Sequence, residues 1–249
     1  MGREPGEEGA SVRIAPEGWP VILIVVALCV LAGAVAAWLH PVAGGAMGLV
    51  GVLMIAWSLW FFRDPIRTAP KGVDLVISPA DGKVIKIDRA ALPEEVRQGD
   101  SVARPRVSIF LNLFDVHVNR VPVAGVIKQL SYVPGKFFNA SLDKASIYNE
   151  RSAAVMVDDQ GREVAFVQIA GLVARRIVNH LKPGQRVEAG ERFGLIRFGS
   201  RAEVYLPEGS LIDVKVGQRV VAGTSVLGRL PVVSKATLAV GVEGAGVSS

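Results

Sequence analysis

Two long uncharged runs dominate the hydrophobic pattern near the start of the chain. They cover residues 19–39 and 42–62, and neither contains an acidic or basic residue. Each run matches the roughly 20 residues that an α-helix needs to cross a bilayer, and tryptophans lie near the run ends, where the membrane interface favours them. The connector between the runs is too short for anything but a tight hairpin. The pattern therefore predicts two membrane helices within 19–62, after a polar tail at 1–18.

The charges beside these runs predict how the hairpin is oriented. Arg63, Arg67 and Lys71 follow the second run, whereas the hairpin tip carries no Lys or Arg. Basic flanks favour the cytoplasmic side, so the remaining chain is expected at the cytoplasmic face of the cell membrane. A signal peptide fits less well, because four glutamates precede the first run. A hairpin that inserts without crossing stays open, because the second run is rich in small residues.

Beyond Lys71 the pattern changes to short runs rich in Val and Ile, which Gly, Pro and Asp separate. Runs of this kind predict strands. We place them at 73–77, 83–88, 106–111, 125–132, 153–157, 164–169, 192–197, 202–206, 211–214 and 225–230. Only 173–181 has some helical periodicity. Residues 63–230 are therefore expected to form one mainly β catalytic domain, followed by a flexible tail at 231–249.

A short internal repeat refines the expected fold. Residues 184–190 read GQRVEAG and residues 217–223 read GQRVVAG, with identity at six of seven positions and a predicted strand after each copy. One valine between turn glycines is typical of a hammerhead-like β unit that pairs with a quasi-symmetric partner. Residues 78–84, SPADGKV, also read as a turn followed by an apolar strand. The expected domain is a single barrel-sandwich that resembles the biotinyl and lipoyl carriers, preceded by the helical hairpin.

The remaining composition narrows the classes of function. The single cysteine, Cys29, lies inside the first apolar run, so no intrachain disulfide is possible. The three histidines are far apart in sequence, and we expect no metal site. The net charge of +5 comes from scattered Lys and Arg residues without a basic run. This pattern favours an anionic membrane surface over nucleic acid as the partner.

Three segments carry candidate chemistry. Asp81 stands in SPADGK, His117 stands in FLNLFDVHVNRVP, and Ser200 follows Gly199 in a third segment. Alternation along the second segment predicts that Asp115, His117 and Asn119 share one face of a strand. A serine, a histidine and an aspartate are the parts of a hydrolase-type triad, although the G-x-S-x-G elbow is absent. Each residue alone also fits a structural role in a turn or a core.

The Gly199-Ser200 pair is suited to attack on its own backbone. A glycine has no side chain beside its carbonyl and tolerates strained backbone, so the following hydroxyl can reach that carbonyl. The segment then enters a predicted strand rather than a helix. Ser200 is therefore better placed to act on the peptide bond before it than on a separate substrate.

Four motifs, in order, resemble the phosphatidylserine decarboxylase family in its short, archaeal-type bacterial form. The resemblance runs from about Arg63 to about Leu230. The motifs are SPADGKV at 78–84, DVH at 115–117 with Pro122 and Gly125, YVPGKFF at 132–138, and FGLIRFGS at 193–200.

The resemblance implies a proenzyme that cuts itself between Gly199 and Ser200, giving a β chain of 1–199 and an α chain of 200–249. Residue 200 would then carry a covalent pyruvoyl cofactor that forms a Schiff base with the substrate, without metal or pyridoxal phosphate. Asp81 and His117 match the family's relay for self-cleavage. The implied reaction converts membrane phosphatidylserine to phosphatidylethanolamine and CO2. The implied enzyme is a heterodimer of the two fragments, and a higher oligomer is left open.

One departure from the family pattern concerns the proton donor. Longer members carry a second histidine before the proline, and Arg120 stands at that position here. His117 is therefore expected to serve both self-cleavage and protonation. Phe137 and Phe138 match an apolar loop of the family and, with Arg120, are candidate substrate contacts, although core packing explains the phenylalanines equally well.

Two other functions stay compatible with the sequence alone. A pyruvoyl decarboxylase of a soluble amino acid shares the chemistry but gives the two apolar runs no role. A membrane-anchored adaptor would use the β domain for assembly, with Gly199-Ser200 as an ordinary turn. Cleavage after residue 199 separates the adaptor from both enzymes.

Overall fold

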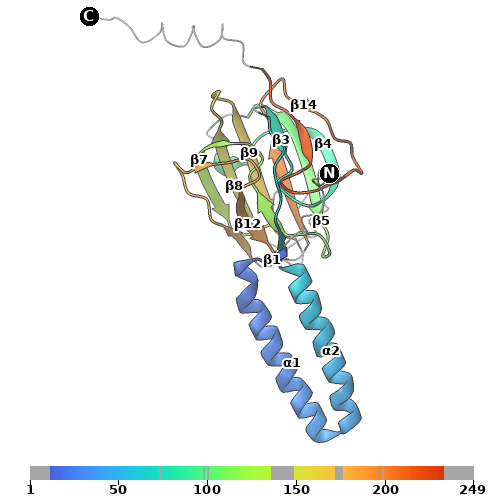
Figure 1. Ribbon diagram of the computed structural model, residues 1–249. Coiled ribbons are helices and arrows are strands. Elements are labelled where there is room, and N and C mark those ends of the chain that lie inside the picture. The colour runs from blue at the N-terminus through green and yellow to red at the C-terminus, as the bar shows by residue number, and fades with distance from the viewer. Residues whose placement is uncertain are drawn as a thin grey trace, which may run out of the picture.

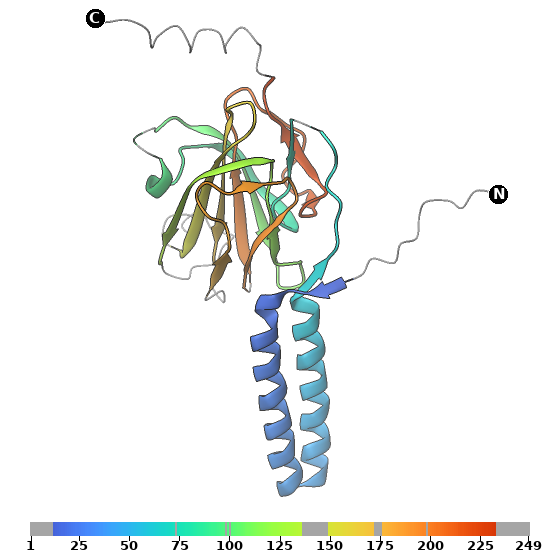
Figure 2. The same cartoon turned by 60° about the vertical axis from the view of Figure 1, so that its left-hand side comes forward.

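A helical hairpin projects from one end of a mainly β domain (Figures 1 and 2). The computed structural model describes residues 12–72, 74–97, 99, 101–135, 149–171, 176–197 and 199–232. Helix α1 spans Trp19–Leu39 and helix α2 spans Pro41–Phe61, as the apolar runs predict. Each helix has a proline in its first turn, where the missing N–H breaks no hydrogen bond. Between them His40 is extended, and its Nδ1 accepts a hydrogen bond from the Val42 N–H at 3.3 Å.

The two helices pack through small residues and expose their large ones. A Cβ added to Gly44 would lie 2.5 Å from the Ala37 Cβ, and one added to Gly51 would lie 3.1 Å from the Cys29 Cβ. Glycines at such contacts are typical of helix pairs in membranes. Both helices are long and apolar enough to cross a membrane. Side chains more than 60% exposed include Leu23, Leu28, Leu31, Val52 and Leu53. The hairpin therefore supports membrane association.

Within the described residues, the strands pair in antiparallel fashion and form four sheets. The largest sheet has the order β11-β7-β8-β9-β13-β5-β4-β15. Its strands are β4 (Gly82–Ala90), β5 (Arg104–Leu111), β7 (Gly125–Val133), β8 (Arg151–Val157), β9 (Glu163–Ile169), β11 (Arg186–Val187), β13 (Ser200–Tyr205) and β15 (Arg219–Val220).

The smaller sheets complete the domain. One has the order β10-β12-β6, another the order β14-β16-β3, and β1 pairs with β2 beside the hairpin. Their strands are β1 (Val12–Ile14), β2 (Arg63–Pro65), β3 (Leu75–Ile77), β6 (Val118–Arg120), β10 (Ile177–Asn179), β12 (Arg192–Ile196), β14 (Leu211–Ile212) and β16 (Val226–Arg229). Two short 3-10 helices cover Pro16–Gly18 and Glu94–Val96.

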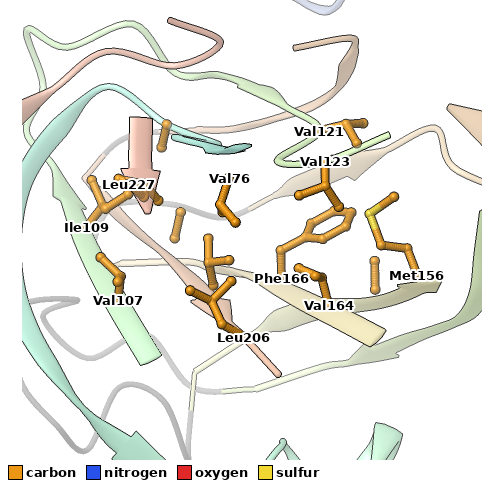
Figure 3. Packing of buried hydrophobic residues seen from close by; sticks show 14 of the residues in the cluster. Val76, Val107, Ile109, Val121, Val123, Met156, Val164, Phe166, Leu206 and Leu227 are labelled. Atoms are coloured by element: carbon orange, nitrogen blue, oxygen red, sulfur yellow. The ribbon is translucent and has the colours of Figure 1, made fainter. Parts of the chain in front are cut away.

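The main core lies between the large sheet and the two three-stranded sheets (Figure 3). Ile109 from β5 and Phe166 from β9 meet Val76 from β3 and Leu227 from β16, and none of the four is more than 2% exposed. Strand alternation directs these side chains inwards, because every second residue of a strand faces the same side. The apolar runs of the sequence thus supply the two facing layers.

The internal repeat forms two equivalent units at opposite edges of the large sheet. The Gly184 N–H donates to the Ile127 carbonyl at 2.7 Å, and the Gly217 N–H donates to the Val84 carbonyl at the same distance. The central valines, in β11 and β15, are 1% and 2% exposed. This confirms the quasi-symmetric hammerhead-like units and the sandwiched β fold.

The ten predicted strands all appear, but two local expectations are wrong. The segment with helical periodicity contains β10, because pairing with β12 fixes its backbone as a strand. Asp115 is not on a common strand face with His117 and Asn119, since β6 begins only at Val118 and Asp115 lies in the preceding turn. In both cases pairing with β12 determined where the strand begins and ends.

Candidate active site

Ser200 begins β13 and is completely buried. Its backbone pairs with Leu111 of β5, and Gly199 before it has a φ of +60°, in the left-handed region that favours glycine. The Ser200 Oγ has no hydrogen-bond partner among the residues that the structure describes. A buried hydroxyl without a partner is unfavourable and rare in folded proteins, which makes Ser200 a candidate functional group.

His117 lies at the same end of the domain as the Gly199-Ser200 bond. Its carbonyl accepts a hydrogen bond from the Ile196 N–H at 3.3 Å. Because only four Cα steps separate Ile196 from Ser200, their Cα atoms are at most about 15 Å apart. His117 Nδ1 lies 2.9 Å from the Asp115 carbonyl oxygen. A carbonyl only accepts, so Nδ1 carries the hydrogen and Nε2 keeps its lone pair.

The environment of His117 keeps the imidazole neutral. Burial lowers its pKa to about 4, and the charge of Arg63 lowers it as well. The Asp115 carbonyl and the charge of Asp81 act in the opposite direction but do not outweigh burial. Nε2 has no partner in the described part of the chain. At neutral pH His117 can therefore act as a general base.

The end of the membrane hairpin packs directly on this histidine. The ring of Phe61, the last residue of α2, lies 4.3 Å from the His117 ring between centroids. Phe61 and Phe62 join Val116 and Leu195 in a small core between hairpin and β domain. Sequence reasoning missed this contact, because Phe61 reads only as the end of an apolar run.

Two buried amides are hydrogen-bonded to each other: Gln168 lies on the same face of the large sheet as Ser200, and Asn119 belongs to β6 of a smaller sheet. Gln168 of β9 pairs with Ala202, two residues after Ser200, and its Nε2 donates to the Asn119 Oδ1 at 2.9 Å. The Gln168 Oε1 has no partner within the described ranges. Gln168 was also missed, although a glutamine in the apolar run EVAFVQI was a usable signal.

Asp81 is held by groups other than His117. Its carboxylate accepts two hydrogen bonds from Arg67, at 2.5 and 2.9 Å, and one from the Ala222 N–H at 2.8 Å. Asp81 thereby ties the linker after α2 to the second repeat. Asp81 acts on His117 through its negative charge, which raises the His117 pKa. The described part of the chain shows no hydrogen bond between the two side chains.

Arg120, the last residue of β6, binds the same linker after α2. Its guanidinium donates to the Asp64 carboxylate at 2.9 Å, the Pro65 carbonyl at 3.0 Å and the Gly190 carbonyl at 3.1 Å. Phe137 and Phe138, the other candidate substrate contacts, lie outside the described residues.

Arg201 follows Ser200 but faces the opposite side of β13. It is 1% exposed and forms an ion pair with Glu203 at 2.6 Å. Glu203 also accepts from Arg106, at 3.4 Å, and from the Tyr205 hydroxyl, at 2.7 Å. This buried network belongs to the structure of the sheet. In the described ranges no group of three or more His, Cys, Asp or Glu side chains is arranged to hold a metal ion.

The fold and the site define a class: a membrane-associated, mainly β protein with a buried serine and a neutral histidine at the hairpin end of the domain. Residues 54–228 match the sequence profile of the phosphatidylserine decarboxylase family. The chain is 51% identical over 214 residues to the phosphatidylserine decarboxylase proenzyme of Paramagnetospirillum magneticum, covering 86% of this chain and 85% of the relative. The proteins of the same name from Rickettsia bellii and Rickettsia felis are each 55% identical over 181 residues, or 73% of this chain and 78% of the relative. The chain belongs to the phosphatidylserine decarboxylase family.

Proposed function

We propose that this chain is made as a proenzyme and, after self-cleavage, removes the carboxyl group of phosphatidylserine to give phosphatidylethanolamine and CO2. The observation that carries the proposal is the buried Ser200 Oγ without a described partner, directly after the left-handed Gly199. The family match supports the choice of substrate. A lipid substrate also gives the hairpin a function, which a soluble amino acid does not.

Self-cleavage begins with attack of Ser200 Oγ on the Gly199 carbonyl carbon, while His117 Nε2 takes the hydroxyl proton. The peptide bond becomes an ester, and the Ser200 nitrogen is released as an amine. Loss of the Ser200 α proton then breaks the ester, freeing a carboxylate on Gly199 and leaving dehydroalanine at position 200. Water converts dehydroalanine to a pyruvoyl group with release of ammonia.

The residues around position 200 fit such a group. Ser200 is inaccessible to solvent, and its face of the large sheet carries the amide of Gln168, which is hydrogen-bonded to Asn119 of β6; such amides can orient polar atoms. When bound, a pyruvoyl group supplies an electron sink for decarboxylation. His117 is the proposed carrier of the proton that replaces the carboxyl group: its neutral Nε2 first takes up a proton from water and then donates it. Asp81 supports His117 as the second member of the relay, through the charge that raises its pKa.

The two fragments are expected to stay together as a heterodimer. Strand β13 of the C-terminal fragment pairs on one side with β5 and on the other with β9, both from the N-terminal fragment. Strands β15 and β16 are likewise paired with β4 and β3. Separation would break hydrogen bonds in two sheets. We also propose that the hairpin crosses the cell membrane, with the β domain on the cytoplasmic side, because the basic flank lies there.

The test compares the wild type with Ser200→Ala and with Ser210→Ala, a matched serine of the same fragment that bonds the Pro207 carbonyl. On denaturing gels and by intact mass, the wild type and Ser210→Ala should give two fragments, the smaller without a free amine. Ser200→Ala should stay intact and release no CO2 from phosphatidylserine. An intact wild type would support the adaptor. Cleaved protein that releases CO2 only from a soluble amino acid would support the other decarboxylase.

A further inference from the structure

An apolar turn projects beside the hairpin end of the β domain. It covers residues 112–115, between β5 and β6 (Figure 2). Leu113 is 39% exposed and Phe114 is 68% exposed. Exposed apolar side chains mark an interaction site where they belong to a larger apolar surface, so the surface next to this turn matters.

Hydrogen bonds hold this turn in one shape. The Phe114 N–H donates to the Asn112 Oδ1 at 2.8 Å, and the Asn112 N–H donates to the Asp115 Oδ2 at 2.9 Å. The Asp115 carboxylate is also paired with Arg219. The structure thus fixes the turn while leaving both apolar side chains outside the core, rather than letting them fold inwards.

The turn is attached to the last turn of α2. Arg63 donates to the Trp60 carbonyl and to the Phe114 carbonyl, both at 2.7 Å, and its guanidinium lies 4.2 Å from the Trp60 ring centroid. Trp60 is 55% exposed on the hairpin surface. Tryptophans near the ends of membrane helices favour the interfacial layer of the bilayer. Phe114 therefore continues the apolar surface of the hairpin at that level.

We propose that Leu113 and Phe114 form a second membrane contact, inserted into the interfacial layer of the lipid bilayer next to α2. Continuity with the hairpin surface identifies the partner as lipid rather than another protein. Because His117 follows Phe114 by three residues, the contact sets the site at the depth of the lipid head groups. A head group then reaches the site without leaving the bilayer. The inference rests on the proposed membrane insertion and lipid substrate.

The test measures the depth of single labels in lipid. With Cys29 replaced by serine, Phe114→Cys carries an environment-sensitive fluorophore in phosphatidylcholine and phosphatidylserine vesicles that contain nitroxide lipids. The label should show at least a twofold loss of fluorescence with nitroxides near the head groups. Leu211→Cys is the matched control, because Leu211 is 65% exposed on β14, at the end of the domain away from the hairpin (Figure 1). Its label should not be quenched.

A label on Cys29 in the otherwise unchanged chain distinguishes the proposed second contact from insertion of the hairpin itself. If Cys29 is quenched by deep nitroxides and Phe114→Cys is not, the second contact is refuted while membrane insertion stands. If neither is quenched, the hairpin does not insert and both fail. A label that is shielded from water but not quenched indicates a protein partner and also refutes the proposal. Leu113→Cys repeats the measurement if Phe114→Cys does not fold.

Discussion

Truncation of Phe61 should remove the packing of the membrane hairpin against the His117 imidazole. Phe61 is completely buried and its ring packs on the imidazole. Phe→Ala substitutions in cores cost about 3–5 kcal/mol, and the cavity here would open beside the imidazole. Water in that cavity would hydrate the charged form of His117. Phe61→Ala should therefore raise its pKa from about 4 towards the ordinary value of 6.5.

The magnitude follows from this change in pKa. At pH 5.5, a group with a pKa of about 4 is more than nine-tenths neutral, whereas one with a pKa of about 6.5 is roughly one-tenth neutral. If neutral His117 is the base, wild-type self-cleavage should stay constant from pH 8 to 5.5. The variant should slow by up to roughly tenfold over that range. The free energy of unfolding should depend on pH in the same direction. The pKa of His117 is depressed in the folded state, so the stabilisation from its neutral form is present above pH 6.5 and is lost as pH falls towards 4.

The assay follows the two fragments on denaturing gels after synthesis of the proenzyme into lipid nanodiscs at each pH. Phe62→Ala is the matched control: Phe62 is 1% exposed, directly follows the same helix, and packs against Gly18. It should lower stability without moving the pH midpoint. An unchanged midpoint in Phe61→Ala, or an equal shift in both variants, would refute the reasoning.

Three further predictions concern the β domain. Glu203→Ala removes the carboxylate that pairs with buried Arg201 at 2.6 Å, while Arg106 keeps its ion pair with Asp88, and the change should lower the free energy of unfolding by about 3–5 kcal/mol in denaturant titrations; a change below about 1 kcal/mol would contradict this. Val187→Ala and Val220→Ala remove equivalent buried side chains, so each should cost about 2 kcal/mol and their effects should add, which chemical denaturation of the double variant measures. Asp81→Asn should slow self-cleavage more than Arg67→Gln in a gel time course, because only Asp81 is assigned to the relay; equal slowing would indicate that their ion pair acts only on the linker.

Local sequence patterns determined the hairpin and the strands that carry the core. Uncharged runs of helical length can satisfy their backbone polar groups in lipid only as helices, so 19–62 allowed little choice. Strands such as β5 and β9 could be predicted equally well, because short runs of apolar residues bounded by Gly and Pro favour β-strands. The repeat indicated the quasi-symmetry, and the ordered motifs around Ser200 indicated the family.

Only the tertiary structure decided what surrounds the site. Phe61 and His117 are far apart in the chain, and their contact exists because the hairpin ends against the loop before β6. Short strands such as β6 and β10 have too few residues for a periodic signal, and pairing with β12 forms them. Asp81 was identified from its motif, but its hydrogen bonds to Arg67 depend on how the linker crosses the repeat. Sequence thus fixes features that depend on neighbouring residues, while the partners of buried polar groups depend on packing between distant segments.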